Sequence, residues 1–263
     1  MRFILAAMLT LCAPARVGAQ AAPQTQATTP ATTETAVSLD KEPHHHLVLE
    51  NSFMRAYYVE IPGHQATLLH RHDFPFVDVA LGPADVMSDV IGKPEAHLTL
   101  NDGQAFYSPG GFSHVIRTDA GMQFRDFTVE LLRPQAKPRN RCVTVLANEP
   151  LGECPQHNPG VASQPPPLYS IKPIFETDEI LVESGVIAAG GSYMQPANRP
   201  ARLLLVLDQS TLSMDEVGKP EKELHTGDVL WIPAGATPTF RNATAFQTCA
   251  FELIAFKDSL PGS

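Results

Sequence analysis

A near-repeat of one short motif constrains the fold of this chain more than any other feature of its sequence. Residues 92–114 read GKPEAHLTLNDGQAFYSPGGFSH, and residues 218–238 read GKPEKELHTGDVLWIPAGATP. Each copy contains glycine, five residues, proline, one residue, glycine, two residues and then a final position. That position is His114 in the first copy and Pro238 in the second. The chain is therefore predicted to be a duplication in which only the first copy keeps this histidine.

Both halves are rich in short β-type segments separated by glycine, proline and asparagine. The clearest strand signals are residues 54–61, 77–81, 104–107, 124–132, 203–207, 229–232 and 250–256. Many short strands with frequent turns are typical of β-sandwiches and β-barrels. We therefore expect an all-β protein with domains at residues 44–132 and 169–257, joined by a proline-rich connector at residues 133–168.

The beginning of the chain resembles an export signal. Arg2 supplies a positive start, residues 3–11 are apolar, and the sequence VGA at residues 17–19 suits a cleavage point. The apolar run is too short to cross a bilayer, so no membrane span is expected. We expect residues 1–19 to be a cleaved signal peptide and residues 20–43 to be a flexible spacer. The protein would then be periplasmic or secreted.

The charge of the chain restricts its partners. The formal net charge is −9 and the sequence pI is about 5.5. Nucleic-acid binding and adsorption to an anionic membrane both need a basic surface. Neither is expected, and we predict a small-molecule substrate or ligand instead.

Three cysteines lie beyond the predicted signal peptide. An exported protein meets an oxidising compartment, so Cys142 and Cys154, both in the connector, are predicted to form a disulfide. Cys249 lies in an apolar strand-like run and is predicted to be a buried free thiol. A cysteine-based metal site is not expected, because the sequence has no Cys-x2-Cys pair.

Three histidines of the first half are candidate metal ligands. His70 and His72 are one residue apart, so on a strand both side chains point to the same face. His114 follows a Pro-Gly-Gly turn that could deliver a third imidazole. Neutral imidazole suits Fe, Mn, Ni, Cu and Zn, so we expect one divalent transition metal among these five. The alternative is that the three are ordinary core or surface histidines.

These histidines stand in motifs that resemble those of the cupin superfamily, which consists of small jelly-roll β-barrels. The second cupin motif, Gly-x5-Pro-x-Gly-x2-His, is matched without a gap and ends at His114. The first motif has glycine, five residues and His-x-His; here Gly63 precedes His70 and His72 with one extra residue in the gap. Because both halves carry the pattern, the resemblance implies a quercetin-dioxygenase-like bicupin: two jelly-roll barrels in tandem, the second degenerate.

The chain departs from the cupin pattern at one position. The glutamate of the first motif should follow His72 by four or five residues, where Phe76 and Val77 stand. Asp78 shares the face of Phe76 on a strand. It could approach the metal, orient a ligand imidazole or act as a general base, and we name it as the candidate catalytic residue. The alternative is a buried carboxylate that is hydrogen-bonded for structural reasons.

The remaining histidines and the nearby aromatic residues are given structural roles. Three adjacent histidines, at residues 44–46, cannot all face one ion and are predicted to be solvated. His64 is expected at a barrel rim, and His97 and His225 are expected to be exposed. The aromatic residues near the site would either shape a ligand pocket or belong to the core; they are Phe74, Phe76, Phe106, Tyr107 and Phe112.

The second half has no corresponding ligands. At the offset of the repeated GKPE sequence, His70 and His72 fall on Pro196 and Asn198. We therefore expect the second barrel to be structural, either packing against the first barrel or completing a homodimer.

Three functions remain open from the sequence. The protein could be a metal-dependent dioxygenase that acts on a small organic molecule. It could be an isomerase or lyase that uses the same metal without redox chemistry. It could also be a non-catalytic binding or scaffold protein, because a fold alone implies no function.

Overall fold

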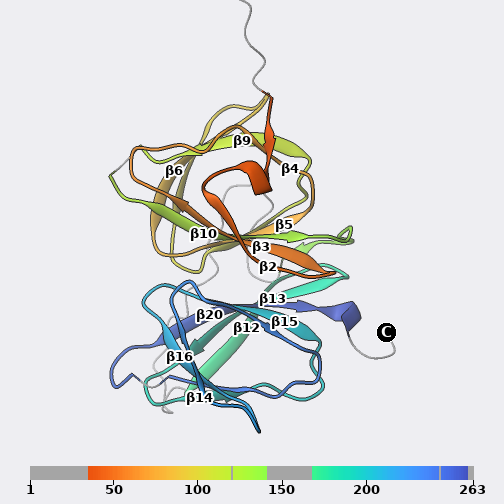
Figure 1. Ribbon diagram of the computed structural model, residues 1–263, viewed down its shortest axis with the longest axis vertical. Coiled ribbons are helices and arrows are strands. Elements are labelled where there is room, and N and C mark those ends of the chain that lie inside the picture. The colour runs from red at the N-terminus through yellow and green to blue at the C-terminus, as the bar shows by residue number, and fades with distance from the viewer. Residues whose placement is uncertain (1–34, 120, 141–167, 243, 260–263) are drawn as a thin grey trace, which may run out of the picture. The chain divides into compact units, whose positions relative to one another are not determined.

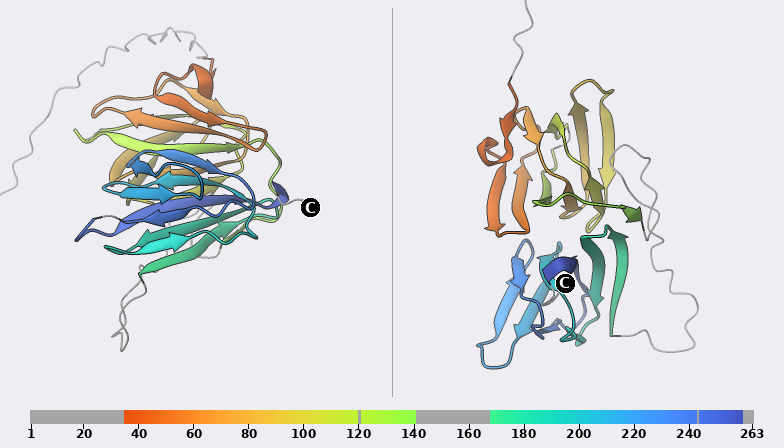
Figure 2. Two further views of the ribbon diagram at one scale, coloured as in Figure 1. Left: turned by 60° about the horizontal axis from the view of Figure 1, so that its bottom comes forward. Right: turned by 90° about the vertical axis from the view of Figure 1, so that its right-hand side faces the viewer.

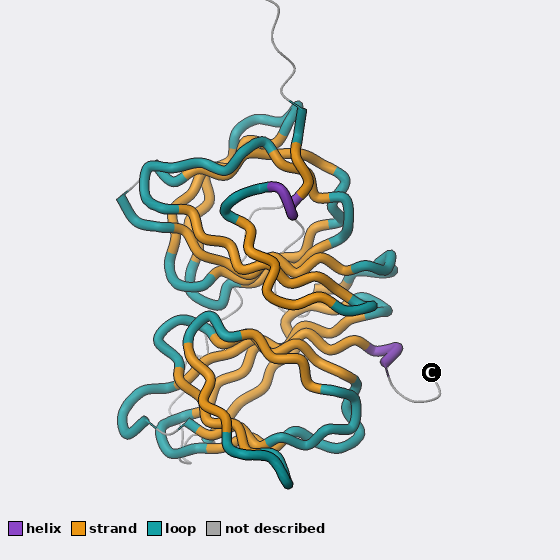
Figure 3. Tube along the Cα trace, viewed as in Figure 1, coloured by secondary structure: helices purple, strands orange, loops and turns teal. Residues whose placement is uncertain are grey.

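The computed structural model describes residues 35–119, 121–140, 168–242 and 244–259. Within these residues the chain forms strands and two short 3-10 helices, η1 (Leu39–Lys41) and η2 (Lys257–Ser259). The strands make four sheets, two in each half of the sequence (Figures 1 and 3). The expected all-β class is thus confirmed. The predicted signal peptide and the two connector cysteines lie outside the described residues.

Two five-stranded sheets form the first barrel. One has the order β1 (Val37–Ser38), β4 (His70–His72), β9 (Phe112–Arg117), β6 (Ala84–Val90), β7 (Ala96–Leu100). The other has the order β2 (His45–Glu50), β3 (Met54–Ile61), β10 (Phe124–Leu131), β5 (Phe76–Ala80), β8 (Ala105–Ser108). The two sheets face each other (Figure 2), and strands distant in sequence are neighbours in both, as in a jelly roll.

The second barrel repeats this plan. Its six-stranded sheet has the order β11 (Arg139–Asn140), β12 (Tyr169–Glu176), β13 (Ile180–Ile187), β20 (Cys249–Phe256), β15 (Ala201–Val206), β18 (Val229–Ile232). Its four-stranded sheet has the order β14 (Ser192–Met194), β19 (Thr239–Arg241), β16 (Thr211–Asp215), β17 (Lys222–His225). All seven strand segments expected from the sequence are present, to within two residues at each end.

Successive side chains along the long strands point to opposite sides of their sheet. On β10, Phe127, Val129 and Leu131 belong to a large cluster that also takes Ile254 and Phe256 from β20. The side chains between them on β10 point the opposite way, into the first barrel, because the side-chain period of a strand is two. On β10 these inward-facing side chains include Asp126, Thr128 and Glu130, so this strand is apolar toward the shared core and polar toward the first barrel.

The N-terminal segment is ordered earlier than expected. Residues 20–43 were predicted to be a spacer, but β1 begins at Val37 and pairs in parallel with β4, in the register Val37 with His70. Leu39 of η1 is buried, at 3% exposure. Residues 35–43 are still largely polar, and the side chain of Leu39 together with the pairing of β1 holds this segment on the barrel.

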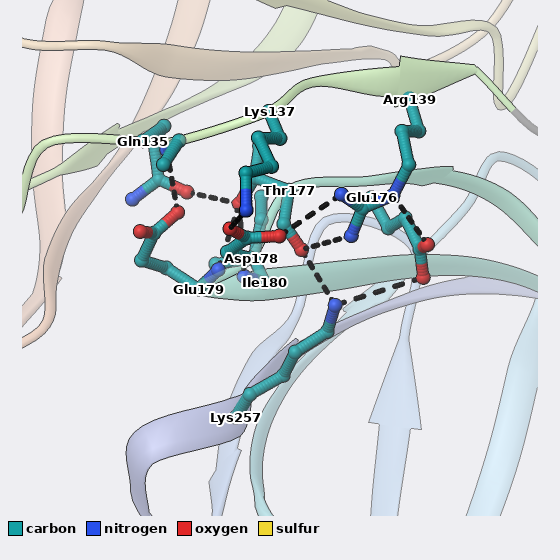
Figure 4. A network of polar contacts seen from close by, with 10 residues as sticks. Gln135, Lys137, Arg139, Glu176, Thr177, Asp178, Glu179, Ile180 and Lys257 are labelled. Carbon is teal, nitrogen blue, oxygen red and sulfur yellow. Dashed lines mark hydrogen bonds and ion pairs between the residues drawn. The ribbon is translucent and has the colours of Figure 1, made fainter.

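The connector is also ordered at its beginning. Residues 133–168 were expected to lack strands, but Arg139 and Asn140 form β11, which pairs with β12. Figure 4 shows the polar network that holds this stretch against the β12–β13 turn. The guanidinium of Arg139 donates to Glu176 and Asp178, and the Ala136 N–H donates to Glu179. Such contacts involve charged side chains at a turn, and the local sequence gives no period from which to predict them.

Two further expectations can be checked. Cys249 is a buried free thiol, as predicted. Among the described residues, no helix is both long enough and apolar enough to span a bilayer.

Candidate metal centre

The three candidate ligands come from two adjacent strands of the first barrel. β4 pairs antiparallel with β9, and in this register His70 lies opposite His114. His70 and His72 are 0% and 2% exposed, whereas Arg71 between them points outward. His114 is 9% exposed. The predicted same-face geometry therefore brings all three imidazoles into the barrel interior.

The hydrogen bonds of the rings leave nitrogen lone pairs free to bind a metal. The Nδ1 of His70 lies 2.9 Å from the carbonyl oxygen of Leu68. A carbonyl only accepts, so Nδ1 carries the proton and Nε2 presents its lone pair. This Nε2 is buried and has no hydrogen-bond partner among the described residues. The Nδ1 of His114 contacts the Ser88 hydroxyl at 3.3 Å, and its Nε2 lies 3.0 Å from the Nε2 of His72.

Burial keeps the cluster neutral. Desolvation, together with the neighbouring His45, lowers the pKa of His70 to about 4. Burial and the adjacent imidazoles lower the pKa values of His72 and His114 well below the ordinary value. Neutral imidazole is the form that binds a metal, so the site does not have to lose protons before binding at pH 7.

The spacing of the donors fits a single ion. The Nε2 atoms of His72 and His114 are 3.0 Å apart, and one ligand atom from each of the three residues lies within 4.8 Å of the others. Two nitrogens that bind one ion at about 2.1 Å should be about 3.0 Å apart at a right angle and about 3.4 Å apart in a tetrahedron. The three imidazoles are therefore a suitable donor set for a divalent transition metal, and His72 and His114 already have the spacing of two ligands of one ion.

A cavity opens beside the three histidines. Its volume is about 360 Å³, and its walls are mainly apolar side chains, among them Val59, Val86, Leu98, Phe106 and Ile116. Of the aromatic residues named from the sequence, Phe76, Phe106 and Phe112 line it. Tyr107 instead belongs to the large core cluster and stacks on Phe175. An enclosed apolar space with a few polar groups is typical of a site for a small organic molecule.

Phe76 stands where the cupin pattern has glutamate. Its ring stacks on the imidazole of His72, with centroids 4.2 Å apart and planes inclined at 26°. The phenyl ring fixes the orientation of this imidazole but supplies no donor atom. The first barrel therefore offers three imidazoles without the usual carboxylate from this position.

Asp78 faces the same cavity and has an acidic companion that the sequence did not reveal. Asp78 on β5 and Asp126 on β10 both line the cavity, and each has a buried carboxyl oxygen without a partner among the described residues. Burial raises the pKa of Asp78 to about 7, against a hydrogen bond with Thr128. Burial and the nearby Asp78 raise the pKa of Asp126 well above its ordinary value. The pair therefore holds at least one proton at neutral pH.

His45 is the second residue of the site that sequence reasoning missed. It was expected to be solvated with His44 and His46, but its side chain is only 4% exposed and lines the cavity. Its ring centroid lies 4.8 Å from that of His70 and 6.5 Å from that of His72. The period-two rule was a valid hint here, because it allows one of three adjacent histidines to face inward while the next faces solvent. His64, His97 and His225 are exposed, as expected.

Among residues 168–242 and 244–259, the second barrel has no corresponding cluster. The Gln195 N–H donates to the carbonyl of Pro238 across the two strands where His70 faces His114 in the first barrel. Gln195 therefore takes the place of His70, one residue before the Pro196 that the offset of the repeated GKPE sequence predicts. The interior instead contains a buried ion pair of Arg202 and Glu183, with a nitrogen–oxygen distance of 3.1 Å.

These two barrels, with a histidine cluster inside the first, have the fold of two-domain cupin proteins. No family model matches the sequence, and no curated protein matches it. Solved structures share the fold over most of the chain, which confirms the resemblance seen in the motifs. At the sequence identities involved, this likeness establishes the fold alone.

Three of these structures illustrate the range. A salicylate 1,2-dioxygenase from Pseudaminobacter salicylatoxidans is 11% identical, with a TM-score of 0.54 over 81% of this chain and 76% of that chain. A cupin 2 conserved barrel domain protein from Leptotrichia buccalis is 11% identical, with a TM-score of 0.50 over 81% and 88%. A vicilin from Solanum melongena is 13% identical, with a TM-score of 0.52 over 77% and 74%.

Proposed function

We propose that this protein is a metal-dependent dioxygenase that acts on a small, largely apolar organic molecule in the first barrel. The observation that carries the proposal is the convergence of three neutral imidazoles on one wall of a mainly apolar cavity. His70, His72 and His114 would hold one divalent ion of Fe, Mn, Ni, Cu or Zn. Such an ion would supply open positions for oxygen atoms and Lewis acidity at a substrate carbonyl or enol.

The walls of the cavity support the proposed class of substrate. Apart from the imidazoles and the two aspartates, most lining side chains are aliphatic or aromatic. A flat aromatic or enolic molecule would pack between Phe106 and Phe112 while its oxygen atoms face the histidines. The salicylate 1,2-dioxygenase of the same fold gives this class of substrate independent support.

Asp78 and Asp126 would move the substrate proton. A general base works best when its pKa lies near the working pH, and the pKa of Asp78 is raised to about 7. The second carboxyl would keep the shared proton within the cavity. Thr128, which also lines the cavity, would hold the ionised form of Asp78 by a hydrogen bond.

The test is oxygen consumption by the metal-loaded protein. Purified protein is stripped with a chelator, reloaded separately with each of the five ions, and mixed with flavonols, diketones and phenolic acids in an oxygen electrode. We expect substrate-dependent uptake with at least one ion, and loss of that uptake in His72→Ala but not in His225→Ala, which alters an exposed histidine of the second barrel. Absence of uptake with every ion and every substrate would rule out the dioxygenase.

The acid pair also favours a second candidate, an isomerase or lyase that moves a proton without oxygen. In that reaction Asp78 would remove a proton next to a carbonyl and Asp126 would return one. Substrate turnover under anaerobic conditions with Zn²⁺ would distinguish this reaction. If neither activity occurs but aromatic molecules bind, the protein is a binding protein, which is the third alternative.

We further propose that the protein acts outside the cytoplasm. The support is the sequence alone: a positive start, an apolar run and small residues before position 20. Mass spectrometry of the exported protein should find a mature chain that begins at Gln20. The homodimer also remains a proposal, which size-exclusion chromatography with light scattering would test.

A further inference from the structure

The N-terminal segment, residues 35–50, reaches the metal centre, although no motif in the sequence predicts a role for it there. Parallel pairing places Val37 beside His70, and the Val37 N–H donates to the Leu69 carbonyl at 2.9 Å. The chain then turns through η1 and enters β2 at His45. This path brings a fourth imidazole to the three that the motifs supply.

Glu42 fixes the orientation of that imidazole. Its side chain is buried, at 2% exposure, and one carboxylate oxygen accepts from the Nδ1 of His45 at 2.6 Å. The other oxygen accepts from the Leu68 N–H at 3.1 Å. Because the Nδ1 of His45 is engaged by Glu42, the Nε2 of the ring is left available to another partner.

This arrangement is the one that metal-binding histidines usually have. A ligand histidine commonly donates its second ring N–H to a carboxylate or a carbonyl, which fixes the tautomer and the ring orientation. Glu42 does this for His45, as the Leu68 carbonyl does for His70. The backbone of Leu68 therefore supports both histidines. Its N–H donates to Glu42, which orients His45, and its carbonyl accepts directly from His70.

The ring separations match a common ion. Among His70, His72 and His114 the centroid separations are 4.5, 4.9 and 5.2 Å. An imidazole centroid lies about 3.2 Å from an ion that its nitrogen binds at about 2.1 Å, so adjacent ligands should be about 4.5–5.2 Å apart and opposite ligands about 6.4 Å apart. His45 lies 4.8 Å from His70 and 6.5 Å from His72. The separation of His45 from His70 falls in the range shown by the three motif histidines, whereas its separation from His72 is longer.

We propose that His45 is the fourth ligand of the metal centre, held in place by Glu42, and that it replaces the carboxylate missing at Phe76. The centre is then built from four imidazoles, one of which comes from the segment before the barrel motifs. This inference rests on the metal site of the proposed function but not on any particular reaction.

The first test counts imidazoles in the unmodified protein. The chelator-stripped chain is loaded with one equivalent of Zn²⁺, and X-ray absorption spectroscopy is recorded at the zinc edge. We expect scattering from four imidazoles. Scattering from three would overturn the role of His45 and leave the three-histidine centre intact. If no zinc is retained, both the inference and the proposed metal site are wrong.

The second test measures affinity by titration with Co²⁺, monitored by its visible absorption. His45→Ala should weaken binding at least 100-fold and change the cobalt spectrum, because it removes a ligand. Glu42→Gln should weaken binding about 10–100-fold with a similar spectrum, because it removes only an orienting partner. His46→Ala, which alters the exposed neighbour, is the matched control and should bind as the parent does. Unchanged affinity in His45→Ala would overturn the inference, and the imidazole count of the parent decides even if this variant does not fold.

Discussion

The phenyl ring of Phe76 stacks on the imidazole of His72 at a centroid separation of 4.2 Å. Phe76 is 3% exposed and lines the cavity, so it acts both as part of the core and as a support for one ligand. A chain that had kept glutamate here would have gained a donor atom and lost this support. The first prediction follows from this contact.

Phe76→Ala should lower the free energy of unfolding by about 3–5 kcal/mol, because it removes a buried aromatic side chain and leaves a void. The void adjoins the cavity, so the variant should also admit bulkier aromatic ligands. Urea unfolding measures the first effect and ligand titration the second. Phe246→Ala is the control, since Phe246 is 96% exposed and its loss should change stability by less than about 0.5 kcal/mol.

Gly110 should be far less replaceable than Gly111. Both have positive φ, 68° and 78°, so alanine brings about 1–2 kcal/mol of backbone strain at either position. A Cβ at Gly110 would also lie 2.1 Å from the carbonyl oxygen of Phe74, whereas a Cβ at Gly111 meets no atom within 4 Å.

Gly110→Ala should therefore cost more stability than Gly111→Ala, and it should weaken metal binding because the displaced turn leads directly to His114. Equal effects of the two substitutions on urea unfolding would show that the contact with Phe74 is relieved without cost.

The buried acid pair should make stability depend on pH. The pKa of Asp78 is raised from 3.8 to about 7 in the folded protein, so between these values the folded chain holds a proton that the unfolded chain releases. The stability that this carboxyl contributes is present below pH 4 and is lost as the pH rises to about 7.

Asp78→Asn cannot ionise, so it should gain stability relative to the parent between pH 4 and pH 8. The gain should be at least about 1.4 kcal/mol, the equivalent of one pK unit. Urea unfolding at several pH values gives the difference. Asp89→Asn, at an exposed position, should follow the parent at every pH.

Metal binding should raise thermal stability. An ion at a free concentration 100 times its dissociation constant adds about 2.7 kcal/mol to a protein that binds it only when folded. The parent should show this gain by differential scanning calorimetry with the ion that binds best. His114→Ala should lose most of it, whereas His97→Ala, at an exposed position, should keep it. A parent whose melting temperature does not respond to any of the five ions would contradict the candidate centre.

Removing one partner of the buried ion pair in the second barrel should lower the free energy of unfolding strongly. Replacing both partners with apolar side chains should lower it much less. Arg202 is 0% exposed and pairs with Glu183, which also accepts from Arg199. Glu183→Gln leaves the guanidinium of Arg202 without its counter-charge and should cost about 3–5 kcal/mol. The double variant Glu183→Leu, Arg202→Met should recover most of this loss in urea unfolding, because two apolar side chains of similar size need no partner. A double variant that is as unstable as the single one would show that the pair is stabilising in itself.

The sequence predicts those parts of the molecule that depend on short-range periodicity. β3 and β18 have the expected bounds, and His70 and His72 face inward because strand side chains alternate. The spacing of the glycine- and proline-containing motif likewise placed His114 near them. What these features share is that a few neighbouring residues decide them.

The rest depends on contacts between distant parts of the chain. Asp126 approaches Asp78 only because β10 pairs with β5. His45 reaches His70 only because β1 pairs with β4 and Glu42 binds Leu68. Neither pairing has a local signature in the sequence, so a carboxyl partner and a fourth imidazole both escaped prediction.

The pair of Arg202 and Glu183 has a consequence for how the two barrels differ. The interior of the first barrel contains a cavity lined in part by uncharged imidazoles, which are free to bind an ion or a small molecule. The interior of the second barrel instead contains two oppositely charged side chains, Arg202 and Glu183. The position that the three candidate imidazole ligands occupy in the first barrel has no counterpart there among the described residues, and the charge inside the second barrel is balanced by side chains of the chain itself.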